Sequence, residues 1–309
     1  LVCRSCGATR ALEVLEDMAM EGCYPDIVTY NSLVSFTSKQ GNYEDTALVI
    51  INLLSRGMQP NVVTYNTLIR SLSSHGHWDA VDDIVKIMNE TSSPPTRITY
   101  NILLNGLCKS GFLDRSINLY NTMVSKNCSP DIVTYNTLLN ALCKEGFIDE
   151  GIQLLYLLVG TNCSPGLVTY NIVIEGLARM GSIELAKEMY GEMVEKGIDP
   201  DEITHNSLAL GFFRVGQFEE AVELLKEMYK KGHKVKNAAC KCVILGLCKQ
   251  KKLDIAIQAL DLMLKSQCKP DESVYYALIK AVADGGMVKE ANDLHQRLIK
   301  WKSLKKDFI

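Results

Sequence analysis

Hydrophobic residues recur along most of this chain with the three- and four-residue spacing of amphipathic helices. Within 132–146, Tyr135, Leu138, Leu139 and Leu142 share one helical face, and polar residues lie between them. No stretch alternates apolar and polar residues between turn signals, as a half-buried strand would. The pattern therefore predicts an all-α protein.

Prolines and glycines divide these helices into pairs with a fixed period. Seven of the eight prolines follow one another in steps of 35 residues, with a final step of 70. They are Pro25, Pro60, Pro95, Pro130, Pro165, Pro200 and Pro270. A glycine recurs where the first helix of each pair should end, at Gly41, Gly76, Gly111, Gly146, Gly181, Gly216 and Gly286. A fixed period of this size indicates a solenoid, in which each two-helix unit buries its apolar face against its neighbours.

Counted from Ile27, the chain contains eight complete repeats and one truncated repeat, in a single solenoid that covers 1–309. The complete repeats are 27–61, 62–96, 97–131, 132–166, 167–201, 202–236, 237–271 and 272–306. Residues 1–26 form the truncated repeat, and 307–309 form a short tail. Because the chain begins at Leu1 without a signal-like or transit-like segment, we expect it to be a piece of a longer protein.

Two segments carry a resemblance to a known family. Residues 133–146 read V-T-Y-N-T-L-L-N-A-L-C-K-E-G, and residues 221–232 read A-V-E-L-L-K-E-M-Y-K-K-G. They resemble pentatricopeptide repeat proteins, in the subclass built from uniform 35-residue repeats. The resemblance covers essentially the whole chain, although Cys240 and Lys251 in the seventh repeat replace the usual Tyr and Gly. It implies a right-handed superhelical solenoid of helix-turn-helix repeats that binds single-stranded RNA, one base per repeat.

The overall charge gives no sign of nucleic-acid binding, because 33 basic residues face 36 acidic ones and the net charge is −3. A basic residue nevertheless recurs in the last turn of the first helix, as Arg4, Lys39, Lys109, Lys144, Arg179, Arg214 and Lys249. These residues can complement the negative end of the helix dipole, or they can form a stripe that follows an RNA phosphate backbone. Because equivalent positions of a solenoid align in space, the shared register favours phosphate contacts.

An asparagine recurs directly after the aromatic residue of the first helix, as Asn31, Asn66, Asn101, Asn136, Asn171 and Asn206. It can cap the helix, or its amide can bind the edge of a base. We favour base recognition because a threonine two residues earlier, such as Thr134, is better placed as the cap. The amide would then be free for a ligand.

The resemblance implies that each asparagine selects its base together with the last residue of the same repeat. The pairs are Asn31 with Asn61, Asn66 with Thr96, Asn101 with Asp131, Asn136 with Gly166, Asn171 with Asp201, Asn206 with Lys236, and Lys241 with Asp271. Asn with Asp implies uracil, and Asn with Asn or Thr implies a pyrimidine with cytosine favoured. Read from the 5′ end, the asparagine pairs imply the target Y-C-U-Y-U-Y, where Y is a pyrimidine.

A branched apolar residue precedes the threonine in the same helices, as Val28, Val63, Ile98, Val133, Val168 and Ile203. The resemblance implies that these side chains sandwich the bases. Ordinary packing in the core is the alternative.

The other reactive residues give no active site. The eleven cysteines mostly recur at two repeat positions, which indicates small apolar side chains in a reducing compartment. Cys3 and Cys6 form one C-x-x-C motif without a second such motif or paired histidines, so we expect neither zinc nor another cofactor. No histidine begins the H-x-E motif of zinc deaminases, and no apolar run is long enough to span a membrane. We therefore expect a protein that is not an enzyme and binds no small molecule or membrane.

The resemblance further implies a plant organelle, with the chloroplast favoured over the mitochondrion, and a role in RNA splicing, stabilisation, editing or translation. Single-stranded RNA and other organellar RNA-processing proteins would be its partners. A protein-binding scaffold of the tetratricopeptide type is the alternative function. The 35-residue period and the recurring polar and basic residues on one helix favour RNA.

Overall fold

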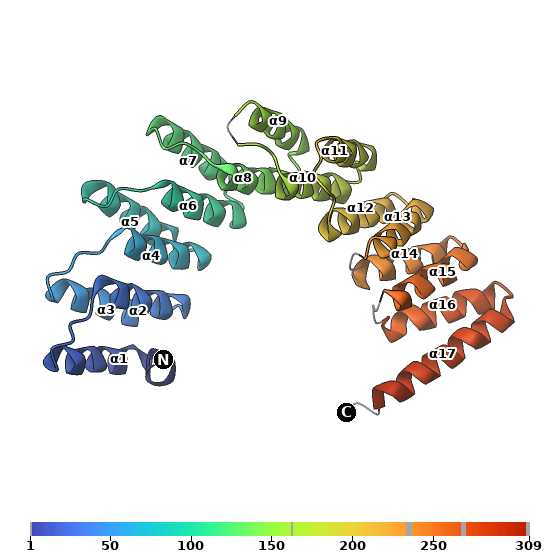
Figure 1. Cartoon of the computed structure of the whole chain (residues 1–309), viewed down its shortest axis with the longest axis horizontal. Coiled ribbons are helices and arrows are strands. Elements are labelled where there is room, and N and C mark those ends of the chain that lie inside the picture. Colours follow the sequence, from blue (N-terminus) through green and yellow to red (C-terminus); the bar gives the residue numbers. More distant parts are fainter. Residues whose placement is uncertain (1, 162, 233–236, 267–269, 307–309) are drawn as a thin grey trace. The chain divides into compact units, whose positions relative to one another are not determined.

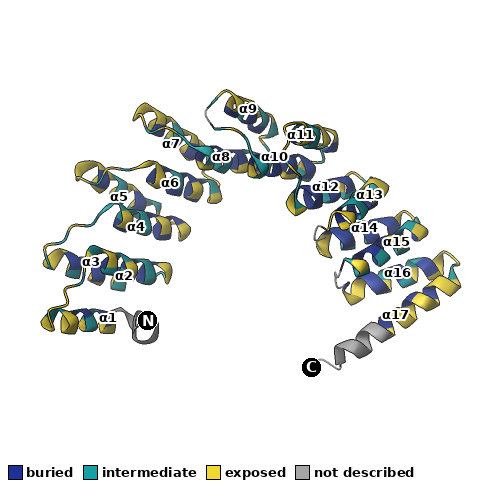
Figure 2. Cartoon of the chain, viewed as in Figure 1, coloured by how far each residue is buried: buried dark blue, intermediate teal, exposed yellow. Residues whose placement is uncertain are grey.

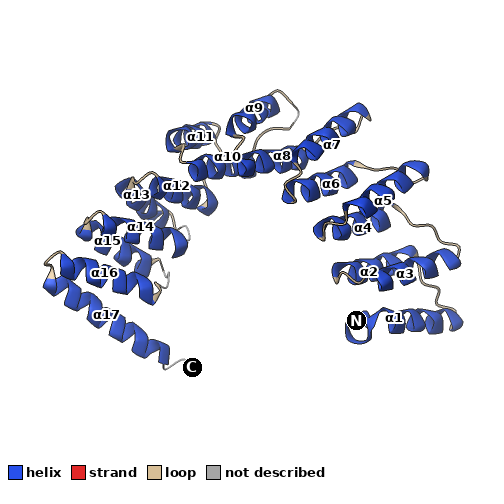
Figure 3. Cartoon of the chain, turned by 180° about the vertical axis from the view of Figure 1, so that it is seen from behind, coloured by secondary structure: helices blue, strands red, loops and turns tan. Residues whose placement is uncertain are grey.

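The computed structural model describes residues 2–161, 163–232, 237–266 and 270–306, with side chains from residue 9 to residue 299. These ranges contain helices and no strand (Figure 3). The helices are α1 (Val2–Met20), α2 (Ile27–Lys39), α3 (Tyr43–Ser55), α4 (Val62–Ser74), α5 (Trp78–Glu90), α6 (Arg97–Lys109), α7 (Leu113–Ser125), α8 (Ile132–Glu145), α9 (Ile148–Val159), α10 (Leu167–Met180), α11 (Ile183–Glu195), α12 (Glu202–Arg214), α13 (Phe218–Lys230), α14 (Asn237–Lys249), α15 (Leu253–Lys265), α16 (Glu272–Asp284) and α17 (Val288–Lys306). None of the described helices is both long and apolar enough to cross a membrane. The prediction of an all-α solenoid of two-helix repeats is confirmed.

The chain divides into two compact units, Leu1–Ala141 and Leu142–Ile309. In the first unit the first helices α2, α4 and α6 pack against one another in order, and α3, α5 and α7 follow as their hairpin partners (Figure 1). In the second unit α10, α12, α14 and α16 form the corresponding row, and α13 contacts α15 in the row of second helices. Each unit is therefore a two-layer stack in which the first helices make one continuous surface.

The first helices begin at a capping residue that is the last residue of the preceding repeat. Asn61 has extended backbone angles (φ −112°, ψ 178°), and its side chain accepts hydrogen bonds from the backbone N–H groups of Val63 and Thr64. The Thr64 hydroxyl in turn accepts from the Asn61 N–H, which completes a capping box. The prediction that the threonine is the N-cap is therefore wrong, because it is the third residue of the helix.

The first helices end on a left-handed residue, which is a glycine in most repeats. Gly181 closes α10 with φ 82°. In the seventh repeat Lys251 takes the glycine's place and still adopts φ 58°. The turn is therefore kept although a side chain with a Cβ costs about 1 kcal/mol in this region.

The first and second helices of a repeat bury their facing sides (Figure 2). Tyr30, Tyr170 and Tyr275 of the first helices are at most 1% exposed, and Met88 and Met193 of the second helices are fully buried. This core fixes which face of each first helix points away from its partner. That outer face carries the predicted site residues.

The first helices of successive repeats approach closely at a small residue. A Cβ added to Gly211 in α12 would lie 2.8 Å from the Cβ of Ala178 in α10. Real side chains do not pack at that separation, so glycine is required there. The close approach brings the start of each first helix beside that of the next.

The truncated repeat differs from the sequence prediction. Residues 2–20 form one continuous helix, α1, and not the end of a first helix followed by a second helix. Arg4 therefore lies in the first turn of α1, and its side chain lies outside the described residues.

Candidate nucleic-acid interface

Three of the predicted residue pairs are joined by a hydrogen bond between neighbouring first helices. In each, the amide nitrogen of the asparagine donates to an oxygen of the capping residue at the start of the next first helix. The distances are 3.3 Å for Asn31 to Asn61, 3.0 Å for Asn101 to Asp131 and 3.0 Å for Asn171 to Asp201. Two residues that are 30 positions apart in sequence thus form one polar group, which is half-buried in the first two pairs and includes the buried Asn171 in the third.

The amide oxygen of the same three asparagines is also occupied. It accepts a hydrogen bond from the threonine hydroxyl of the next capping box, at 2.6 Å from Thr64 to Asn31, 2.6 Å from Thr134 to Asn101 and 2.6 Å from Thr204 to Asn171. The prediction that these amides are free is therefore wrong. One N–H of each amide remains for a ligand, because the other N–H and the carbonyl already have partners.

The carboxylates in two of these pairs are held ionised. Burial alone would raise the pKa of Asp131 and of Asp201, but hydrogen bonds from the next threonine and from the paired asparagine bring each pKa below its ordinary value. All of the hydrogen bonds to Asp131 from Asn101 and Thr134 go to Oδ1. Its Oδ2 accepts none of these bonds and lies 3.3 Å from Nε of Arg97. Each pair therefore offers an N–H donor beside a carboxylate acceptor.

One other pair lacks this bond, and another lies partly outside the described residues. The Oδ1 atom of Asn66 is buried without a hydrogen-bond partner among the described residues, and its predicted partner Thr96 bonds to Thr99 instead. Asn206 donates through Nδ2 to the carbonyl of Glu202 in its own helix, at 2.6 Å. Its predicted partner Lys236 lies outside the described residues.

The seventh repeat replaces the amide pair by an ion pair. Lys241 Nζ lies 2.6 Å from Oδ2 of Asp271. Hydrogen bonds from Lys241 and from Ser273 lower the pKa of Asp271 to about 2. The remaining pair is divided between the units, with Asn136 on α8 in the first and Gly166 at the start of α10 in the second.

The branched residues at the second position of the first helices are exposed and do not pack in the core. Their exposed fractions lie between 46% and 65% for Val28, Val63, Ile98, Val133, Val168 and Ile203. The core-packing alternative is therefore wrong. Four of these exposed Val or Ile side chains lie in the first unit and two in the second, each on the helix that carries an asparagine of a predicted pair.

The basic residues at the end of the first helices fall into two groups. Lys39, Lys109, Lys144 and Lys249 are exposed and form no ion pair within the described ranges. Arg179 donates to the carbonyl of Cys143 at 2.8 Å, and Arg214 to that of Ala178 at 3.5 Å. The arginines thus bind the carboxyl end of the preceding first helix, a contact that neither interpretation of these residues predicts. Each guanidinium keeps further N–H groups for an anion.

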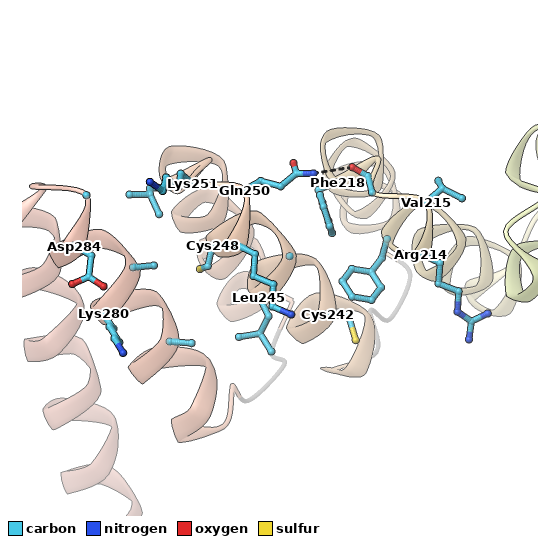
Figure 4. Close-up of a pocket in the computed structure, with 18 residues that line it drawn as sticks. Arg214, Val215, Phe218, Cys242, Leu245, Cys248, Gln250, Lys251, Lys280 and Asp284 are labelled. Atoms are coloured by element: carbon cyan, nitrogen blue, oxygen red, sulfur yellow. Dashed lines mark hydrogen bonds between the residues drawn. The ribbon is translucent and has the colours of Figure 1, made fainter.

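In the second unit the carboxyl-terminal halves of α12, α14 and α16, with the first residues of α13 and α15, line a groove of about 1610 Å³ (Figure 4). Its lining includes Phe213, Cys242, Leu245 and Cys248 together with Arg214, Lys249 and Lys280. The groove therefore combines an apolar floor with cationic side chains, and two of the predicted phosphate-binding residues lie in it.

The cysteines have the properties of packing residues. Burial raises the pKa of the Cys143 and Cys248 thiols to about 11, so the thiolate that binds metals or attacks substrates is disfavoured at neutral pH. Among the described residues, no three His, Cys, Asp or Glu side chains are placed to hold a metal ion. The side chains of Cys3 and Cys6 lie outside the described residues.

Family models for pentatricopeptide repeats match most of the chain. The model described as PPR repeat family matches residues 60–109, 95–144 and 165–214. The PPR repeat model matches 133–163 and 203–233, and the pentatricopeptide repeat domain model matches 7–45 and 223–285. Together these ranges cover well over half of the chain.

Similar proteins come from plants. A pentatricopeptide repeat-containing protein of Arabidopsis thaliana is 52% identical over 45 residues, which are 15% of this chain and 8% of that protein. The crystal structure of the maize pentatricopeptide repeat protein PPR10 aligns with a TM-score of 0.65 and 23% identity, over 90% of this chain and 40% of that one. The nuclear proteinaceous RNase P 2 of Arabidopsis thaliana aligns with a TM-score of 0.51 and 18% identity, over 60% of this chain and 41% of that one. The two structures share the fold of this chain, which spans less than half the length of each.

Proposed function

Because the chain belongs to the pentatricopeptide repeat family, we propose that it binds single-stranded RNA in a sequence-specific manner, one base per repeat. The observation that carries this proposal is the combination found at the start of the first helices. An exposed branched side chain lies there beside an asparagine that is bonded to the next capping residue. An apolar surface next to a small set of oriented polar groups suits a splayed base, which needs both a packing partner and a partner for its edge.

The asparagine–aspartate pairs match the edge of uracil. Uracil presents one N–H between two carbonyl oxygens. The remaining N–H of Asn101 can donate to a uracil carbonyl, and Oδ2 of Asp131, which pairs with Arg97, has a further lone pair that can accept from the uracil N–H, directly or through a water. Cytosine has an acceptor where uracil has that N–H, so the carboxylate disfavours it. Asn171 with Asp201 has the same arrangement.

The asparagine–asparagine pair can form a hydrogen bond with cytosine. Asn61 uses Oδ1 to accept from Asn31 and from its own helix start, so its amide nitrogen is the group left for a base. An amide donor matches the ring nitrogen acceptor of cytosine. Over repeats 27–236 we therefore propose a target close to 5′-Y-C-U-Y-U-Y-3′, with uracil at its third and fifth bases.

We propose that the chain acts by binding and not as an enzyme, with the eight complete repeats as the binding units. Occupying a transcript is sufficient to exclude a nuclease or to remodel an intron, so splicing, stabilisation, editing and translation are the processes that it would serve. A plant organelle, with the chloroplast favoured, is the proposed location because the similar sequences are from plants. Other organellar RNA-processing proteins are the expected protein partners.

The proposed ligand class is tested by pairing the target. An RNA oligonucleotide that contains the pyrimidine target should bind as a single strand, and annealing it to its complement should abolish most of the affinity, because paired bases cannot reach the first helices. The purine complement alone is the matched control and should bind weakly. Equal binding of the single strand and the duplex, measured by fluorescence anisotropy, would overturn the proposal.

The proposed phosphate contacts are tested by salt. Replacing Lys39, Lys109 and Lys144 by Ala should weaken every single-stranded RNA by a similar factor, and the salt slope should fall by about 0.7 for each phosphate contact that is removed. The control is the triple replacement of Lys86, Lys126 and Lys187 by Ala, which removes the same charge from two second helices and from the residue that caps α7. If both triple variants lose the same affinity and slope, net charge and not the stripe explains the effect.

A further inference from the structure

We propose that the threonine at the third position of a first helix is a specificity-determining residue for the preceding repeat, because it fixes the orientation of the base-reading asparagine. The inference deepens the proposed RNA-binding function and rests on it. The assigned residues are Thr64 for Asn31, Thr134 for Asn101 and Thr204 for Asn171. Each threonine is fully buried and lies 33 residues after its asparagine.

The hydroxyl group of Thr134 has one proton to donate, and the nearest acceptor is the side chain of Asn101. The backbone N–H of Asp131 donates to the Thr134 hydroxyl oxygen at 3.1 Å, so the hydroxyl acts as an acceptor there. Its own O–H points to Oδ1 of Asn101 at 2.6 Å, which is closer than Oδ1 of Asp131 at 3.0 Å. The atom of Asn101 that faces the hydroxyl must therefore be the carbonyl oxygen.

The other side of the amide is fixed by charge. Asp131 is ionised and can only accept hydrogen bonds, so the atom of Asn101 that faces it at 3.0 Å must be Nδ2. A reversed amide would place its oxygen against the carboxylate, and the threonine hydroxyl would have to donate to Oδ1 of Asp131, at 3.0 Å, in place of Asn101. The contact between two acceptor oxygens is unfavourable in a partly buried site. The second N–H of the Asn101 amide therefore points in one fixed direction, and it favours a base with a carbonyl oxygen opposite that N–H.

Two other repeats show the asparagine without this contact. Thr99 forms the same capping box with Thr96, through the Thr96 N–H at 3.0 Å, but no bond from Thr99 reaches Asn66. The Asn66 amide oxygen is buried without a partner among the described residues. For the asparagine of the sixth repeat the equivalent residue is Ala239, which has no hydroxyl, and Asn206 donates to the Glu202 carbonyl of its own helix. The contrast with the three bonded asparagines is therefore carried by Asn66, where the described residues show neither the threonine bond nor the bond to the capping residue.

The positioning role is tested by replacing the threonine with valine, which has no hydroxyl group. Thr134→Val keeps the shape of the side chain and removes the bond to Asn101. Binding should be measured for four RNAs that differ only at the base opposite repeat 97–131. We expect the preference for uracil over cytosine, on the order of tenfold or more in the parent, to fall to less than about threefold. The preference at the uracil read by repeat 167–201 should be unchanged.

Thr99→Val is the matched control. Thr99 has the same helix position, the same burial and the same capping box, but it does not contact an asparagine. Its replacement should lower the thermal midpoint as much as Thr134→Val does and leave every base preference unchanged. Thr134→Ser keeps the hydroxyl and should restore the preference for uracil.

The outcomes separate the positioning role from the function that it depends on. If the parent shows no preference at this base, the proposed base reading is wrong and the positioning role fails with it. If the parent prefers uracil and Thr134→Val keeps that preference, the positioning role alone is overturned. It is also overturned if Thr99→Val flattens the same preference, since loss of the cap would then be the cause.

Discussion

With Asn101 replaced by Thr and Asp131 kept, the base preferred opposite repeat 97–131 should change from uracil toward guanine, as the family pattern implies. In the parent, the amide of Asn101 reaches Asp131 and still holds one N–H for a uracil carbonyl. A threonine at this position is shorter and removes that donor. Guanine presents two donors beside one acceptor, and the Asp131 carboxylate can accept from both donors.

The change in preference should be large enough to measure with two oligonucleotides that differ at a single base. A mismatched hydrogen-bonding edge costs about 1–3 kcal/mol, so the ratio of the two affinities should change by roughly ten- to a hundred-fold. Asn171→Thr, which keeps Asp201, should shift the fifth base in the same way. Asn136→Thr is the control and should gain no preference for guanine, because its partner Gly166 has no carboxylate. Identical ranking of the two RNAs by parent and Asn101→Thr would show that Asn101 does not read a base.

The sequence alone predicts the repeated helices, because they follow from a period. The pairing of each asparagine with the last residue of its repeat is implied by the family resemblance and not by the period. Asn101 and Asp131 meet at 3.0 Å, although 30 residues separate them. In the seventh repeat Lys241 and Asp271 meet in the same way with a different chemistry.

The details of hydrogen bonding could not be predicted from the repeat pattern. Asn61 and Thr64 can each cap a helix, and the choice depends on which residue has extended backbone angles. The bond from Thr134 to Asn101 joins two repeats, so no local pattern contains it. The spacing alone does not reveal this bond, since Asn66 is also followed 33 residues later by a threonine, Thr99, which does not bond to it.

The period also could not decide the role of the branched residues. A valine or isoleucine at a fixed helical position is usual in a core. Tyr170, two residues after Val168, is indeed buried. The second position of a helix lies near its open end, where side chains can project away from the hairpin partner. Ile98 and Val168 are accordingly 63% and 61% exposed. Contact between these apolar side chains and water is unfavourable in free energy, and a base that packs against them would remove that contact.

Replacing Ile98 or Val168 by Ser should therefore weaken RNA binding and leave the fold stable. Each side chain buries apolar surface only when a base packs against it, so each replacement should lower the affinity by roughly tenfold, or about 1.4 kcal/mol, on the scale of apolar transfer. The free energy of unfolding should change by less than about 0.5 kcal/mol, as for other exposed positions. Both quantities can be measured on the same samples, by RNA titration and by urea denaturation.

Ile174→Ala is the matched control, because Ile174 lies on the same helix as Val168 and is fully buried. It should lower the free energy of unfolding by about 2–5 kcal/mol, as large-to-small replacements in a core do. At temperatures where it remains folded, its affinity for RNA should stay close to that of the parent. If the branched residues sandwich the bases, the replacements of Ile98 and Val168 should lower the affinity for RNA and not the stability. The replacement of Ile174 should lower the stability and not the affinity. If Ile98→Ser and Val168→Ser bind RNA as tightly as the parent, the exposed branched residues do not contact the bases, and the polar pairs must hold the RNA without them.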